Sequence, residues 1–256
     1  MGGSVTSVSI IVPCYNAGAF LGATLEAVIA QTFTDWECIV IDDASRDDSA
    51  VVLAEYARNE PRIRPVYQPV NGGAAAARNA GLAVIRGRYL AFLDADDDWL
   101  PEKLEKQVAY MHETGAPIVH TSYRFIDEKG GFLPGGVRAS DRVDLRTYMR
   151  NTEIGMSTSL LDRRQVGEFS FRDIRLCQDT HLWLVLLRRG LVSRGMVETL
   201  VHYRVREGQI SGSKVAMAKQ VYALYREIDE VGLATQLFSF ASYAFNGFRK
   251  RMQTPV

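Results

Sequence analysis

The sequence lacks any run of about 18 apolar residues, which is the length that a helix needs to cross a bilayer. Its opening stretch, MGGSVTSVSIIVPCYN, has no basic region before a short apolar run, so it predicts a strand rather than a signal peptide. We therefore expect a cytoplasmic protein without a transmembrane helix.

The sequence also has few cysteines and no formal net charge. The three cysteines, Cys14, Cys38 and Cys177, lie far apart without CxxC spacing, which argues against a disulfide framework or a zinc site and favours a reducing compartment. Lysine plus arginine and aspartate plus glutamate number 30 each, so no overall charge favours a nucleic-acid partner. We expect none.

Short aliphatic runs alternate with helical patterns through the first half. The predicted strands cover 8–12, 37–41, 63–67 and 88–94, and the predicted helices cover 20–30, 48–58 and 74–85, with a further helix opened by Pro101. Continuous aliphatic strands separated by helices are typical of parallel strands that are covered on both faces. The pattern predicts an α/β fold with right-handed crossovers.

The pattern changes after Pro117. A strand entering a hairpin is predicted from PIVHTSYRFID and FLPGG, and a short strand within 155–164. A helix over 179–190, ended by Gly190, and a strand over 196–205 follow, and two helical segments close the chain. We expect one continuous domain with a C-terminal helical extension.

Polar groups follow three of the predicted strands. They are Pro13-Cys14-Tyr15-Asn16, Asp42-Asp43 and Asp94-Ala95-Asp96. Ligands of open α/β sheets bind beyond the carboxyl ends of the strands, so we expect these groups to converge on one crevice. An aromatic ring and several carboxylates suit a nucleoside diphosphate with a divalent cation, since Mg²⁺ and Mn²⁺ prefer hard oxygen ligands and substrate phosphates.

Structural interpretations of the same groups stay open. Tyr15-Asn16 is also typical of a turn, and Asp42-Asp43 of a cap on the next helix. Asp97 and Asp98 are expected to be solvated or to cap the helix after Pro101. Asp94 and Asp96 are harder to explain in this way, because two carboxylates at the end of a buried strand require a positive partner.

Three separated motifs carry a resemblance to a known family. VSIIVPCYNAGAF, NGGAAAARNAGL and GRYLAFLDADDDWLPEKL resemble a family 2 glycosyltransferase of GT-A fold, densely over roughly the first 110 residues. The later segments IRLCQDTHLWLVLLRRG and HYRVREGQISGSK are similar to bacterial glycosyltransferases of teichuronic acid, capsule and O-antigen synthesis. The resemblance implies a domain over 1–213, with a nucleotide-binding half (1–116) and an acceptor-binding half (117–213), followed by helices over 214–256.

The resemblance also implies roles for the donor site. Pro13, Tyr15 and Asp43 match the positions that hold the uracil of a UDP-sugar, with Asn16 beside them, and Arg78 matches an arginine near the nucleotide. The DxD motif falls on Asp94, Ala95 and Asp96, with Asp96 as the ligand of Mn²⁺ or Mg²⁺.

A general base is implied where the family carries a Glu-Asp pair before a helix with a tryptophan. Here the pair is Gln178-Asp179, so Asp179 is the expected base, and capping of the following helix is the alternative role. Arg204 and Arg206 precede a glycine-serine segment that resembles the region closing over the donor diphosphate; surface salt bridges are the alternative for them.

The implied reaction is inverting transfer of one hexosyl unit from a UDP-sugar to a saccharide linked to polyprenyl diphosphate. No QxxRW motif of processive members is present, which favours a single addition. The apolar stripe within 235–252, followed by Arg249-Lys250-Arg251, predicts a helix that packs on the domain or lies on the inner membrane.

Two other functions remain. A sugar nucleotidyltransferase shares the α/β fold and metal carboxylates, but it would normally carry an N-terminal glycine-rich loop with a basic residue, which VPCYNAGAF lacks. A catalytically degenerate nucleotide-sugar-binding scaffold is suggested by Gln178, which stands where the family has a glutamate.

Overall fold

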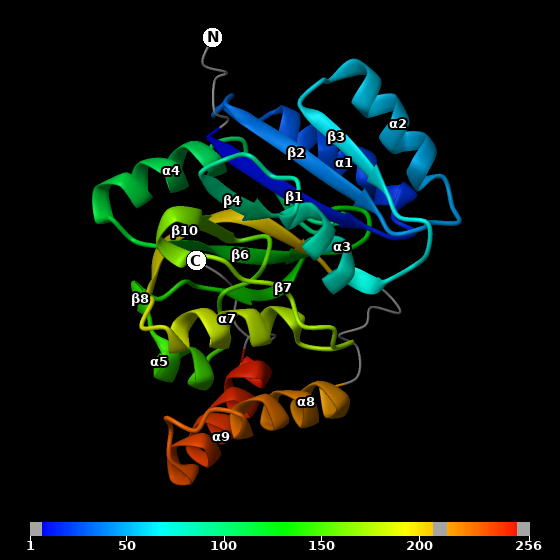
Figure 1. The fold of residues 1–256 in the computed structure, drawn as a ribbon. Helices are drawn as coiled ribbons and strands as arrows, with labels where there is room; N and C mark the ends of the chain where they lie inside the picture. Colours follow the sequence, from blue (N-terminus) through cyan, green and yellow to red (C-terminus); the bar gives the residue numbers. More distant parts are fainter. Residues whose placement is uncertain (1–6, 207–213, 250–256) are drawn as a thin grey trace.

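A computed structural model describes residues 7–206 and 214–249 of the chain (Figure 1). Within these ranges the chain forms one ten-stranded sheet with helices on both faces, and α8 and α9 extend from one end. The predicted α/β class is confirmed.

The sheet has the strand order β3-β2-β1-β4-β9-β6-β10-β5, with β7 paired to β6 and β8 paired to β10. Its strands are β1 (Val8–Cys14), β2 (Trp36–Asp42), β3 (Ile63–Tyr67), β4 (Tyr89–Phe92), β5 (Asp98–Trp99), β6 (Ile118–Ile126), β7 (Phe132–Val137), β8 (Arg142–Val143), β9 (Ser159–Asp162) and β10 (Ser193–Arg204).

The first four long strands are parallel, as their continuous aliphatic runs predict. β1 pairs with both β2 and β4, and β2 pairs with β3. β9 then lies antiparallel between β4 and β6, and β10 runs parallel to β6. The chain reverses direction of winding at β1, so the carboxyl ends of β1, β2 and β4 meet at the edge where such folds bind ligands.

Helices cover both faces of the sheet. They are α1 (Gly18–Ile29), α2 (Ser49–Asn59), α3 (Gly73–Leu82), α4 (Lys103–Thr114), α5 (Leu145–Arg150), α6 (Arg163–Val166), α7 (Gln178–Arg188), α8 (Lys214–Arg226) and α9 (Leu233–Arg249). Alternating side chains of the strands separate two cores. Ile10 and Val12 of β1 pack with α1, α2 and α4, whereas Ile11 packs with α3, α5 and α7.

The predicted helix after Pro101 is present but starts later than predicted. Pro101 lies in a turn, and α4 begins at Lys103 with Glu102 as its N-cap. Gly115 ends α4 in the left-handed conformation, with φ of 65°.

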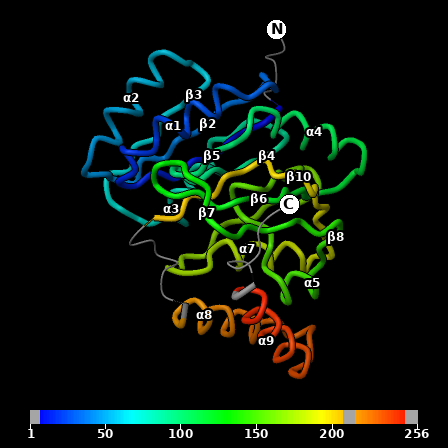
Figure 2. Tube along the Cα trace, turned by 180° about the vertical axis from the view of Figure 1, so that it is seen from behind, coloured from blue at the N-terminus to red at the C-terminus, as the bar shows by residue number. Residues whose placement is uncertain are grey.

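The two C-terminal helices lie side by side below α7 in both views of the chain (Figures 1 and 2). α8 places Val221, Leu224 and Tyr225 in the same core as α7, and the Tyr225 hydroxyl donates to the Met149 carbonyl at 2.6 Å. No helix in residues 7–206 or 214–249 is both long and apolar enough to span a bilayer.

Candidate active site

Asp43, at the end of β2, holds the start of α3. Its carboxylate accepts hydrogen bonds from the amides of Gly72 at 2.8 Å and Gly73 at 2.7 Å, and its own amide donates to the Cys14 carbonyl at 2.8 Å. The side chain is buried. Asp43 therefore caps α3 and not the next helix of the chain, α2, whose N-cap is Asp48.

The loop after β1 offers an aromatic ring to solvent. Tyr15 is 47% exposed. Asn16 has φ of 48°, and its side-chain oxygen accepts from the amide of Arg46 at 2.8 Å. Asn16 is thus a turn residue that fixes the loop. Tyr15 is the side chain that remains accessible to a nucleobase, and Pro13 is partly buried in β1.

Arg78, in α3, joins three segments of the site. Its buried guanidinium donates to the Asp94 carboxylate at 2.6 Å and to the Gln178 side-chain oxygen at 3.2 Å. It also lies over the Phe171 ring, 5.5 Å from the centroid. The structure therefore brings Arg78, Asp94 and Gln178 together at the point where α7 begins.

The carboxylates after Asp94 have separate partners. Asp97 is buried and accepts from the Ser157 hydroxyl at 2.5 Å and the Arg204 amide at 2.9 Å, while Asp98 bonds His202 Nδ1 at 2.9 Å. The expectation that Asp97 is solvated or caps the next helix is wrong, because Asp97 is buried and has partners in β10 and at Ser157. The side chain of Asp98 is 38% exposed, as a solvated residue would be, and also bonds His202.

Asp96 lies between these residues, and its negative charge is only partly stabilised by the protein. Its side chain is 12% exposed and pairs with Arg206 Nε at 2.6 Å. Burial, followed by repulsion from Asp94, nevertheless raises the pKa of Asp96 to about 6, against the opposing effect of Arg206 and Arg204. Such a carboxylate gains most from a further cation.

Arg204, at the end of β10, and Arg206, two residues later, lie in different surroundings. Arg204 is buried and donates to the main-chain oxygens of Asp96 at 2.7 Å and Asp127 at 2.9 Å, so it braces the acidic loop. Arg206 faces the Asp96 carboxylate and is the better placed of the two for a diphosphate. The glycine-serine segment that follows, 207–213, lies outside the described residues.

The donor set fits a cation that arrives with its substrate. The described part of the chain contains no group of three or more His, Cys, Asp or Glu side chains that could hold a metal. Asp96 supplies a hard carboxylate that is partly accessible, and magnesium commonly binds one or two carboxylates together with substrate phosphates. Ala95, between the two aspartates, is fixed by the Thr24 hydroxyl, which donates to its carbonyl at 3.1 Å.

Asp179 lies in the first turn of α7, after the N-cap residue Cys177. Burial raises the pKa of Asp179, and the charge of Asp94 raises it further, while a backbone hydrogen bond from Thr180 and the charge of Arg78 lower it. Cys177 occupies the N-cap position of α7, so Asp179 is not needed as the N-cap of this helix. A carboxylate with a raised pKa close to Arg78 and Asp94 is suited to accept a proton.

Two tyrosines near these carboxylates were not found from the sequence. The pKa of Tyr203 is raised well above its ordinary value by burial and by the charges of Asp97, Asp94 and Asp96; that of Tyr123 is raised by burial, Asp179 and Asp97. Their ring centroids lie 5.8 Å apart, so β6 and β10 form an aromatic wall beside the acidic groups. Tyr203 stands beside Arg204 in a segment that the sequence already singles out, but only the pairing of β6 with β10 brings Tyr123 next to it.

The comparison with known sequences decides the family. The profile described as Glycosyl transferase family 2 matches residues 9–170. The chain belongs to this family. It is 38% identical over 245 residues to a Bacillus subtilis (strain 168) protein provisionally named the teichuronic acid biosynthesis glycosyltransferase TuaG, covering 96% of this chain and 97% of that protein.

A second relative is the Escherichia coli UDP-Glc:alpha-D-GlcNAc-diphosphoundecaprenol beta-1,3-glucosyltransferase WfgD. It is 31% identical over 246 residues, with 95% of this chain and 94% of that protein covered. This family 2 glycosyltransferase is therefore similar to these relatives along nearly its whole length.

Solved structures confirm the GT-A fold. Staphylococcus aureus TarS 1–349 in complex with UDP-GlcNAc has a TM-score of 0.71 at 19% identity, over 94% of this chain and 75% of that one. Mannosyltransferase PcManGT from Pyrobaculum calidifontis, in complex with GDP-Man and Mn²⁺, has a TM-score of 0.68 at 16% identity, over 96% of this chain and 76% of that one.

Asp43→Ala tests whether this residue serves the nucleotide as well as α3. We expect the free energy of unfolding to fall by about 1 kcal/mol, because two amides of α3 lose their acceptor. We also expect weaker binding of UDP, measured calorimetrically on the folded variant. A loss of stability with unchanged UDP affinity would mean that Asp43 is a helix cap only.

Proposed function

We propose that this glycosyltransferase is an inverting, metal-dependent enzyme that transfers one hexosyl unit from a UDP-sugar to a saccharide linked to polyprenyl diphosphate, in bacterial surface polysaccharide synthesis. The observation that carries the proposal is the bridge from Arg78 to Asp94 and Gln178. This bridge joins a carboxylate cluster that attracts cations to a carboxylate that can accept a proton.

The donor would bind in the half of the domain formed by residues 1–116. Tyr15 is free to stack on the base, Asp43 lies beside it at the end of β2, and Asp94 would accept from ribose hydroxyls. Solved structures of this fold contain UDP-GlcNAc in one case and GDP-Man in another, so the fold alone does not determine which nucleobase is bound. The name of WfgD supports a UDP-sugar and an acceptor on diphosphoundecaprenol.

In the proposed reaction Asp179 takes the proton of the acceptor hydroxyl while that oxygen attacks the anomeric carbon. The attack comes from the side opposite the departing UDP, so the configuration inverts. Arg78 keeps Asp94 and the start of α7 in position, and Arg206 would pair with the diphosphate. Asp96 would hold Mn²⁺ or Mg²⁺, which supplies Lewis-acid stabilisation to the leaving diphosphate.

The acceptor would bind in the half formed by residues 117–213, which contains Tyr123 and Tyr203 beside the acidic groups. We further propose peripheral contact with the cytoplasmic face of the inner membrane through α9. Phe238 and Phe245, seven residues apart on one helix face, are 61% and 64% exposed. Exposed aromatic side chains on an amphipathic helix favour the membrane interface. Lys250 and Arg251 of the basic run lie outside the described residues.

Asp96→Ala should abolish transfer and the metal-dependent part of UDP binding, with the fold retained. The reason is that Asp96 is partly exposed beside Arg206 and keeps a raised pKa, which a bound cation would lower. UDP release and Mn²⁺-dependent UDP affinity measure the effect. The matched variant Asp98→Ala, which removes a carboxylate bonded to His202, should keep both properties. Unchanged Mn²⁺-dependent affinity in Asp96→Ala would remove Asp96 from the metal site.

Asp179→Asn should keep donor binding and lose turnover by about 10²–10⁴-fold, the usual contribution of general base catalysis. The parent rate should fall as the pH drops through the pKa of Asp179, which lies above that of an ordinary aspartate. The assay is UDP release at saturating donor, with α-GlcNAc-diphosphoundecaprenol as acceptor.

The exposed residue Asp173 provides the control for this experiment. Asp173→Asn alters a carboxylate in the segment leading to α7 and should leave the rate unchanged. Turnover of Asp179→Asn within a few-fold of the parent would refute the assignment of the base and favour the scaffold function.

A further inference from the structure

We propose that the groove between α8 and α9 binds the isoprenoid chain of the lipid-linked acceptor, beginning next to its diphosphate. The proposal rests on the proposed function for its acceptor class. It adds a binding site outside the cleft that holds the donor and the base.

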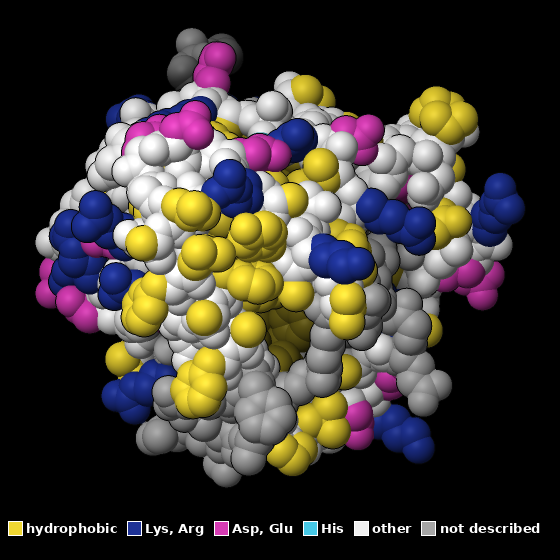
Figure 3. Space-filling model, turned by 90° about the horizontal axis from the view of Figure 1, so that it is seen from below, with side chains coloured by type: hydrophobic (Ala, Val, Ile, Leu, Met, Phe, Trp, Pro, Cys, Tyr) yellow, Lys and Arg dark blue, Asp and Glu magenta, His cyan; other side chains and the backbone are white. Residues whose placement is uncertain are grey.

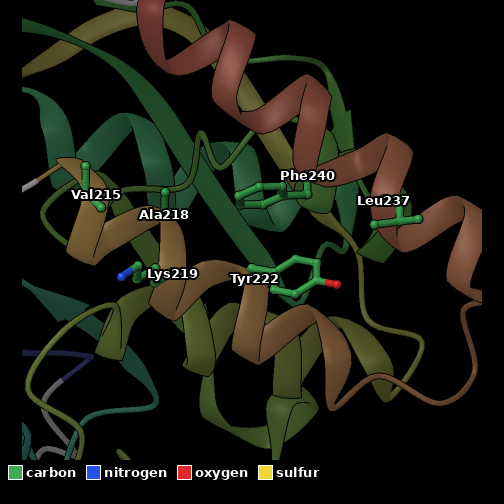
Figure 4. Close-up of a pocket in the computed structure, with 6 residues that line it drawn as sticks. All are labelled: Val215, Ala218, Lys219, Tyr222, Leu237 and Phe240. Atoms are coloured by element: carbon green, nitrogen blue, oxygen red, sulfur yellow. The ribbon is translucent and has the colours of Figure 1, made fainter.

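The groove is a cavity of about 540 Å³, a volume within the range of ligand sites. Figure 4 shows its lining, which comes from both helices: Val215, Ala218, Lys219, Tyr222, Leu237 and Phe240. Seen from this end of the molecule, apolar side chains gather around a hollow (Figure 3). Val215 and Leu237 are 67% and 48% exposed, so apolar surface remains uncovered in the described chain.

Side chains next to the groove pack near the segment that carries the candidate base. Phe240, in its wall, stacks on Tyr243 with ring centroids 6.2 Å apart. Tyr243 packs against the core that contains Cys177, at the start of α7. From α8, the Met217 sulfur lies 3.7 Å from Cys177 Sγ, two positions before Asp179.

The charges on the two helices suit an anionic amphiphile. α8 and α9 contain Lys214, Lys219, Arg226 and Arg249 and no aspartate or glutamate. Lys219 lies in the wall of an otherwise apolar groove. A diphosphate near this cation, followed by a hydrocarbon chain along the apolar lining, matches both features.

The shape of the surface favours a single hydrocarbon chain over a lipid bilayer as the ligand of the groove. Among the side chains of α9 that the structure describes, the most exposed aromatic ones, Phe238 and Phe245, do not line the groove. A flat membrane surface would meet these projecting rings, whereas a cavity between two helices admits a narrow chain. We therefore assign the groove to a single isoprenoid chain.

Calorimetry with farnesyl diphosphate and inorganic diphosphate tests the assignment on the full chain. We expect farnesyl diphosphate to bind more tightly, because only it can fill the groove. The double variant Val215→Gln/Leu237→Gln should weaken its binding about tenfold, since each buried methylene contributes about 0.8 kcal/mol. Inorganic diphosphate should bind the variant and the parent equally.

Phe238→Gln is the matched control, because it alters an exposed apolar residue of the same helix outside the groove. It should leave farnesyl diphosphate affinity unchanged. Ala218→Phe, which fills the groove, gives a second test if the double variant fails to fold. It too should weaken only the prenyl compound.

Equal affinities for the two diphosphates, or unaltered farnesyl diphosphate binding in both groove variants, would overturn the inference. So would a result in which the groove variants lose only flotation on vesicles of phosphatidylglycerol and phosphatidylcholine, since the surface would then contact a bilayer. The proposed function fails separately, through absence of UDP release from any UDP-sugar with either a prenyl-linked or a short alkyl-linked acceptor.

Discussion

Four carboxylates follow one buried strand, Asp94 and Asp96 to Asp98, and the arrangement of the site depends on how the charge of the first three is compensated. Asp94 pairs with the guanidinium of Arg78, and Asp96 pairs with Arg206. Asp97 accepts hydrogen bonds from the Ser157 hydroxyl and the Arg204 backbone amide. Each partner comes from a different element, so compensation of the cluster also fixes those elements relative to one another. Burial and the charge of Asp94 raise the pKa of Asp96 although it pairs with Arg206, so the protein stabilises its charge only in part.

Gln178 changes this balance in a specific way. As an amide it accepts from Arg78 without competing for its charge, while its nitrogen donates to the Ile174 carbonyl at 2.8 Å. A glutamate at this position would add a negative charge beside Asp179 and draw Arg78 away from Asp94. The amide therefore keeps the strongest pairing of Arg78 with Asp94 and limits the rise in the pKa of Asp179.

The sequence predicts those parts of the molecule that depend on local pattern. Buried aliphatic runs and their flanking polar groups locate the parallel strands and the aspartate cluster, because both signals are contiguous. The contact of Arg78 with Gln178 spans 100 residues, and the reversed direction of β9 depends on pairing with β4 and β6. Asp97 was misjudged for the same reason, since its partners lie in distant segments and no local pattern shows its burial.

We propose above that Asp96 binds a cation that arrives with the nucleotide. Titration of the preformed Mn²⁺–UDP complex into the protein near pH 6, in buffers of different ionisation enthalpy, tests it directly, because Asp96 is then partly protonated. We predict proton release on binding that exceeds the release with UDP alone and disappears well above that pKa. Equal proton release with and without the metal near pH 6 would contradict the account.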